Sequence, residues 1–233
     1  MSLIVQTKGL VKSYGKKEVL KNVNFIIPQG QIVGLLGPNG SGKTTIIKTL
    51  AGLLQDYKGE VLINGQKPGV ETKAIVSYLP EKTYLSKWMT VKDAISMFAD
   101  FYADFDEARA WDMVNALSLT SQQKIHTMSK GMQEKLQLIL VMSRNAMLYI
   151  LDEPLGGIDP AARDYILDTI IRNYSDKSSI LLSTHLIHDV ERIFDRVIFL
   201  KNGEVVMEDY VDTLREEHGK SMDELFREVY QGC

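Results

Sequence analysis

Residues 37–44 combine three glycines with a lysine and a threonine in the arrangement of a phosphate-binding loop. They read Gly37-Pro38-Asn39-Gly40-Ser41-Gly42-Lys43-Thr44, and Thr45 follows. Glycines let backbone N–H groups approach a phosphate closely, the lysine can reach the β- and γ-phosphates, and the threonine hydroxyl can ligate Mg²⁺. A glycine-rich turn that only reverses the chain would need neither the lysine nor the threonine. We therefore predict that residues 37–45 bind a nucleoside triphosphate with Mg²⁺.

Two predicted elements position this loop. Gln31–Leu36 is a short apolar run, which predicts a buried strand, and Thr44–Leu53 carries apolar residues at helical spacing. A loop between a strand and a helix aims backbone N–H groups at a phosphate, and the helix N-terminus adds positive partial charge. The context of the loop therefore agrees with its composition.

Two adjacent carboxylates follow a second apolar run, Leu148–Leu151. Neighbouring residues on a strand point to opposite sides, so Asp152 and Glu153 can have different roles. Asp152 is expected to bind Mg²⁺ directly or through water, and Glu153 to face the attacking water as a general base. The alternative is an ordinary polar turn before Pro154. The phosphate-binding loop favours the functional interpretation, because phosphoryl transfer needs a carboxylate that holds Mg²⁺.

The hydrophobic pattern predicts strands in the first part of the chain and a helical insertion between strands of the main domain. The predicted strands are Leu3–Thr7, Val19–Ile27, Gln31–Leu36, Glu60–Ile63, Ile75–Leu79, Met147–Leu151, Ser179–Ser183, Val197–Leu200 and Glu204–Met207. The predicted helices after position 82 are Val91–Phe101, Asp106–Leu117, Lys130–Ser143, Pro160–Tyr174, Val211–Glu217 and Ser221–Tyr230, with capping boxes at Thr90/Asp93 and Ser221/Glu224. We expect an α/β core of residues 1–81 and 146–210 with a parallel sheet, a helical subdomain of residues 82–145, and C-terminal helices over residues 211–233.

Composition limits the class of protein. The chain has 233 residues, 45% hydrophobic and 24% charged, which suits one α/β domain. A formal net charge of -3 and the lack of a long basic run give no reason to expect a nucleic-acid partner. Cys233 is the single cysteine, so a reducing cytoplasm fits best. The sequence has no signal-peptide pattern and no apolar run near the ~20 residues that span a bilayer, so work at a membrane would need another chain to do the spanning.

One further motif narrows the choice among protein families that have a phosphate-binding loop. Met128-Ser129-Lys130-Gly131-Met132-Gln133 precedes Asp152 and opens a predicted helix. It resembles the signature motif of ABC-type ATPases, whose usual form is Leu-Ser-Gly-Gly-Gln. Other marks of that family follow in order: Tyr14 where an aromatic ring stacks on adenine, Gly156-Gly157-Ile158-Asp159 as the D-loop, and Ser183-Thr184-His185 ending in the switch histidine. The resemblance covers the chain from Leu3 to about Met207.

The resemblance implies a fold and an assembly. The fold class would be α/β, with a P-loop NTPase core of mixed β-sheet, an N-terminal antiparallel β subdomain and an inserted α-helical subdomain. Two such subunits would meet head to tail around two ATP molecules, so that Ser129 and Gly131 contact the γ-phosphate held by the partner. His185 would contact the γ-phosphate and orient the water, and Asp159 would link the two sites. Simpler alternatives are an N-cap before Pro160 for Asp159, a half-buried loop aromatic for Tyr14, and a structural role for the histidine.

The chain departs from the family pattern in the signature motif and at one loop. Lys130 replaces the first glycine, Met132 replaces glutamine, and Glu81 stands where the family has the Q-loop glutamine. A glutamate can still bind Mg²⁺, although it adds negative charge beside the γ-phosphate. This combination resembles the subgroup that powers bacterial export-type transporters with separate membrane subunits.

The resemblance also implies partners. A groove formed by Glu81–Ala99, including Tyr84, Trp88 and Met89, would receive a helix of the membrane subunit; local core packing is the alternative for these aromatic residues. We expect the ATP-hydrolysing subunit of an exporter, on the cytoplasmic face of the membrane. A second subunit, identical or closely homologous, and a separate permease would be its partners. The alternative function is a soluble ABC-type ATPase, such as one that serves iron–sulfur assembly.

Overall fold

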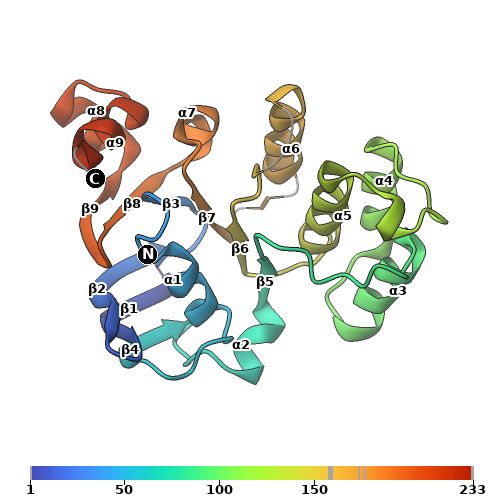
Figure 1. Cartoon of the computed structure of the whole chain (residues 1–233), viewed down its shortest axis with the longest axis horizontal. Helices are drawn as coiled ribbons and strands as arrows, with labels where there is room; N and C mark the ends of the chain where they lie inside the picture. Colours follow the sequence, from blue (N-terminus) through green and yellow to red (C-terminus); the bar gives the residue numbers. More distant parts are fainter. Residues whose placement is uncertain (1, 157–159, 173, 176, 232–233) are drawn as a thin grey trace.

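The computed structural model describes residues 2–156, 160–172, 174–175 and 177–231. Two sheets form the centre of the molecule (Figure 1). The first is antiparallel, in the order β2-β1-β4, and consists of β1 (Leu3–Tyr14), β2 (Lys17–Pro28) and β4 (Lys58–Ile63). This sheet confirms the predicted N-terminal antiparallel unit.

The second sheet has six strands in the order β5-β6-β7-β3-β8-β9. Its first five strands in this order are parallel, and β9 joins the edge antiparallel to β8, so the sheet is mixed as expected. The strands are β3 (Ile32–Leu36), β5 (Val76–Leu79), β6 (Leu148–Asp152), β7 (Ser179–Thr184), β8 (Arg196–Lys201) and β9 (Glu204–Tyr210). Since β3 lies between β7 and β8, the strand that precedes the phosphate-binding loop is at the centre of the sheet.

Helices flank the sheets, and those of the insertion project to one side (Figure 1). Within the described residues, the α-helices are α1 (Lys43–Leu50), α2 (Val70–Ile75), α3 (Val91–Phe101), α4 (Glu107–Ala116), α5 (Lys130–Met142), α6 (Pro160–Arg172), α7 (Ile187–Val190), α8 (Val211–His218) and α9 (Met222–Tyr230). Figure 1 shows α3–α5 on the opposite side of the molecule from α8 and α9. No helix in the described ranges is long and apolar enough to cross a membrane.

The two faces of the six-stranded sheet contribute to two different hydrophobic clusters. Along β3, Val33 and Leu35 pack into one cluster with the antiparallel sheet and α1, whereas Ile32 and Leu36 pack into the other. The second cluster continues into α3–α5 and into the C-terminal helices. Strands buried on both faces have continuous apolar runs, which is why the sequence predicted them as short buried strands.

Several predicted boundaries are wrong. Strand β1 continues to Tyr14 although the prediction ends at Thr7, because Gly9 (φ 60°) forms an irregularity that interrupts the alternating pattern without ending the strand. Helices α2 and α7 were not predicted, since segments of 6 and 4 residues are too short to show helical periodicity. The predicted capping box at α3 is confirmed: the Thr90 hydroxyl accepts from the N–H of Asp93, and the Asp93 carboxylate accepts from the N–H of Thr90.

Candidate functional site

The phosphate-binding loop lies between the end of β3 and the start of α1, as the sequence predicted. Gly40 and Gly42 have φ of 82° and 113°, backbone conformations that residues with a side chain rarely adopt. Gly37 has a different constraint, because a Cβ there would lie 2.5 Å from the Leu200 carbonyl oxygen and 2.6 Å from Ser41 Oγ. The glycines therefore meet two separate needs, left-handed backbone and close packing.

A cleft of about 620 Å³ opens over this loop. One wall is the loop itself, from Asn39 to Thr45, and the other includes the first turns of α5. The remaining lining residues are Val19, Glu81, Lys82, Thr83, Lys130, Gln133, Glu134, Gln137, Glu153, Gly156 and His185. The loop, the carboxylates of Glu81 and Glu153, and the start of α5 thus meet at one cleft.

Lys43 lies over the loop with its ammonium group turned back toward the backbone. Its Nζ donates to the carbonyl oxygens of Gly37 (2.7 Å) and Pro38 (3.3 Å), and lies 3.8 Å from Glu153 Oε1. Burial lowers the pKa of Lys43, while the negative charges of Glu153, Asp152 and Glu81 act in the opposite direction. The lysine is therefore held beside the position where a phosphate on the loop would lie.

Asp152 ends β6 and is almost fully buried. Its Oδ1 accepts a hydrogen bond of 2.6 Å from the Ser183 hydroxyl, whereas its Oδ2 is buried without a hydrogen bond of ordinary geometry to any described residue. Burial raises the pKa of Asp152, and the hydroxyl groups of Ser183 and Thr44 partly offset that effect. Ser183 has no sequence signal of its own, although it lies two positions before His185.

These groups fit a magnesium ion. The unpaired Oδ2 of Asp152 and the nearby Thr44 hydroxyl are oxygen ligands of the kind that Mg²⁺ prefers. A buried carboxylate oxygen without a donor is costly, and a cation would remove that cost. The predicted Asp152–Thr44 pair is thus brought together by the fold.

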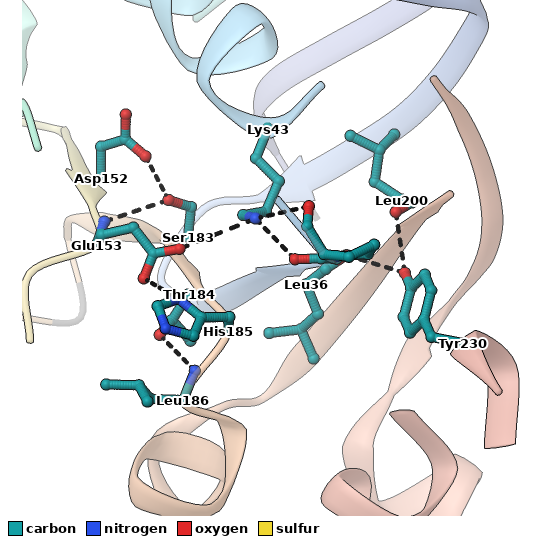
Figure 2. Close-up of polar contacts among 12 residues, drawn as sticks. Leu36, Lys43, Asp152, Glu153, Ser183, Thr184, His185, Leu186, Leu200 and Tyr230 are labelled. Atoms are coloured by element: carbon teal, nitrogen blue, oxygen red, sulfur yellow. Dashed lines mark hydrogen bonds and ion pairs between the residues drawn. The ribbon is translucent and has the colours of Figure 1, made fainter. Parts of the chain in front are cut away.

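The side chains of Glu153 and His185 face each other (Figure 2), and both residues line the cleft. His185 Nδ1 lies 3.0 Å from Glu153 Oε2, so the histidine fixes one carboxylate oxygen while the other faces Lys43. Glu153 has φ of 52°, which is a strained conformation for a residue with a side chain. Its N–H donates to the Ser183 carbonyl, a bond that helps to hold this backbone in place. The sequence did not predict this contact: it predicted that His185 contacts the γ-phosphate and orients the water, and that Glu153 acts as the general base.

Across the cleft, Ser129 caps α5. Its hydroxyl accepts from the N–H of Met132 (3.3 Å), and its side chain is exposed. A Cβ added at Gly131 would have no heavy-atom neighbour within 4 Å, so this surface is open. Lys130 is paired with Glu134 at 3.5 Å, and both line the cleft.

Comparison with known proteins agrees with this geometry. The sequence model of the ABC transporter family matches residues 20–156. The chain belongs to the ABC transporter family. Within that family of ATPases it is an ATP-binding subunit.

Individual relatives support the same assignment. The chain is 35% identical to an uncharacterized ABC transporter ATP-binding protein of Methanocaldococcus jannaschii, over 87% of this chain and 76% of that protein. It is 31% identical to the SkfA peptide export ATP-binding protein SkfE of Bacillus subtilis, over 92% of each chain. A solved ATP-binding subunit of an ABC transporter superposes with a TM-score of 0.88 at 32% identity, over 97% of this chain and 99% of that one.

Three predicted residues of this ABC subunit remain to be placed: Tyr14, Glu81 and Asp159. Tyr14 ends β1 half exposed, with the Lys12 ammonium 5.0 Å from its ring centroid, and it is not among the described residues that line the cleft. Glu81 is exposed and lines the cleft, where its negative charge adds to those of Asp152 and Glu153. Asp159 lies outside the described residues.

Proposed function

We propose that this chain is the ATP-hydrolysing subunit of an exporter that drives a separate membrane permease. The observation that supports hydrolysis most directly is the arrangement of Glu153 between Lys43 and His185 beside the phosphate-binding loop. Export is supported by the relative SkfE, which is named for peptide export. The cytoplasmic face of the membrane is the location that this proposal requires.

The chemistry follows from these positions. Glu153 is the general base: one carboxylate oxygen takes a proton from the attacking water, whose oxygen then bonds to the γ-phosphorus while the bond to ADP breaks. The hydrogen bond from His185 orients the carboxylate, and Lys43 contacts the negative oxygens of the β- and γ-phosphates. Thr44 and Asp152, with Glu81 as a further candidate ligand, would hold Mg²⁺, which neutralises phosphate charge when it is bound.

A second subunit completes the site in this proposal. Ser129 and Gly131 lie at the N-terminus of the 13-residue helix α5, on an open surface. Such an N-terminus binds anions through its N–H groups and its dipole. We propose that it contacts the γ-phosphate held by the other subunit, which is either identical or closely homologous. Tyr14 would stack on adenine, and Asp159 would link the two sites.

The permease surface is proposed on the helical insertion. Trp88 is 73% exposed and Tyr84 is 45% exposed, although the Tyr84 ring also stacks on Phe98 at 6.2 Å between centroids. Met89 is buried in the core, so the predicted participation of Met89 in a surface groove is wrong. Of the three residues, Trp88 therefore has the side chain best placed to contact a partner.

Capture from the membranes of the native cells tests this function. The tagged Glu153→Gln chain should bind ATP, lose about 10²- to 10⁴-fold in hydrolysis because it lacks the general base, and trap the ATP-bound dimer. It should then co-purify a polytopic membrane protein from detergent extracts. Adding Trp88→Ala should weaken that capture, while Trp111→Ala, at the other tryptophan of the insertion, should not. Capture of soluble partners alone would favour the soluble class of ABC-type ATPase, and unchanged turnover would exclude Glu153 as the base.

A further inference from the structure

Helix α9 contacts the end of β3, directly before the phosphate-binding loop, through one hydroxyl group (Figure 2). Tyr230 is the final residue of α9, and its hydroxyl shares its proton between the carbonyl oxygens of Leu36 (3.2 Å) and Leu200 (3.0 Å). These two carbonyls lie at the carboxyl ends of the adjacent parallel strands β3 and β8. Tyr230 therefore satisfies two buried backbone acceptors beside the first residue of the loop.

Gly37 lies between these two carbonyls. The Leu36 carbonyl belongs to the peptide bond that leads into Gly37, and the Leu200 oxygen would be 2.5 Å from a Cβ at Gly37. The next carbonyl along the chain, that of Gly37 itself, accepts the 2.7 Å hydrogen bond from Lys43. Because peptide units are planar, a hydroxyl that fixes the Leu36 carbonyl also restricts the orientation of Gly37, and through it the position of Lys43.

The Tyr230 side chain is itself held firmly. Its ring lies 4.4 Å from the Phe226 ring and 6.2 Å from the Phe199 ring, between centroids. Lys201, the residue after Leu200, donates to the Val229 carbonyl at 2.7 Å, so α9 is also attached to the end of β8. The position of the hydroxyl is thus fixed by the packing of the ring and by the attachment of α9 to β8.

We propose that Tyr230 is a positioning residue for the phosphate-binding loop, so that nucleotide affinity depends on the docking of α9. The proposal goes beyond the transport function, and it rests only on ATP binding by the loop, not on a permease. Residue 230 also lies outside the stretch matched by the family's sequence model, residues 20–156. The matched stretch therefore includes Leu36 but neither Leu200 nor Tyr230.

The test removes the hydroxyl and keeps the ring. Tyr230→Phe should raise the Kd for MgATP about threefold to tenfold, the effect expected from the loss of one hydrogen bond at the loop. Amide hydrogen exchange should become faster in peptides that cover residues 36–45. The matched control is Tyr149→Phe, which removes another buried tyrosine hydroxyl; that hydroxyl donates to the Arg144 carbonyl at the opposite end of β6 from Asp152.

The control separates positioning from general stability. The proposal requires that both variants lose thermal stability, while only Tyr230→Phe weakens MgATP binding and loosens the loop. Equal Kd values for Tyr230→Phe and the unmodified chain would overturn it, and so would an equal loss of affinity in the two variants. A permease that is never found would leave this result unaffected, because the binding measurement uses the chain and MgATP alone.

Discussion

Two buried cations, Lys43 in the core and Arg144 where the helical insertion returns to the core, show how a binding site differs from a structural joint. Arg144 makes hydrogen bonds of 3.0 and 3.1 Å to Asp104, donates to the carbonyls of Ala74 and Val76, and lies 3.9 Å from the Tyr102 ring centroid. Lys43 is nearly as buried, but its closest carboxylate is 3.8 Å away and its ammonium borders an open cleft.

The two side chains differ in how completely their charges are paired within the folded chain. The contacts of Arg144 come from the end of α3, the junction of α2 with β5, and the loop before α4, so they connect segments that are distant in the chain. The contacts of Lys43 are mostly to the carbonyls of its own loop. Arg144 therefore acts as a fixed joint, whereas the charge of Lys43 can still pair with an incoming anion.

The largest expected effect is at Arg144. Arg144→Met leaves Asp104 and two buried carbonyls without their donor, which should lower the free energy of unfolding by about 3 kcal/mol. The Kd of the folded chain for MgATP should stay within about twofold of the original. Urea denaturation and calorimetric titration measure the two quantities. A stable variant that has lost ATP affinity would contradict the assignment of Arg144 as a joint.

Lys43→Ala should show the opposite pattern. Without the ammonium that contacts the β- and γ-phosphates, the Kd for MgATP should rise about 10- to 100-fold, while the midpoint of thermal unfolding changes little. Lys48→Ala is the matched control, since Lys48 is an exposed lysine on the same helix. Equal affinity in the Lys43 variant would remove this residue from the phosphate site.

The smallest effect concerns the pH dependence at Asp152. Burial raises the pKa of Asp152 in the folded chain, so the fold loses stability as the pH rises through that pKa and the carboxyl group ionises. The asparagine side chain in Asp152→Asn stays neutral at every pH, and its amide oxygen can still accept a hydrogen bond from the Ser183 hydroxyl. Without MgATP, the variant should unfold a few degrees higher at neutral pH, and the gain should disappear below the unfolded pKa of about 3.9.

MgATP should reverse the order of thermal stability between the parent chain and the Asp152→Asn variant. The parent chain should gain thermal stability when MgATP is added at neutral pH, and the Asp152 variant should gain much less because it lacks the proposed Mg²⁺ ligand. An equal gain in both chains would show that Asp152 does not contribute to the binding of the metal–nucleotide complex.

The sequence predicted the parts of the molecule that depend on local pattern. The bounds of α3 are confirmed because its capping box and its apolar spacing are both local, and the loop around Lys43 is recognisable from its residue types in order. The strained φ of Glu153 and the contact of Ser183 with Asp152 could not be predicted, since both depend on the pairing of β6 with β7. The contact of Tyr230 is even less accessible to sequence-based prediction, because its acceptor Leu36 lies 194 positions earlier in the chain.

The strand order also has a consequence for synthesis on the ribosome. β3 ends at Leu36, but its neighbours in the sheet are β7, which starts at Ser179, and β8, which ends at Lys201. At translation rates of about 5–20 residues per second, many seconds separate the emergence of β3 from that of the strands that flank it. The nascent chain therefore carries a complete phosphate-binding motif long before it has the sheet that holds this motif in shape. ATP can therefore stabilise this motif only after β7 and β8 have also emerged.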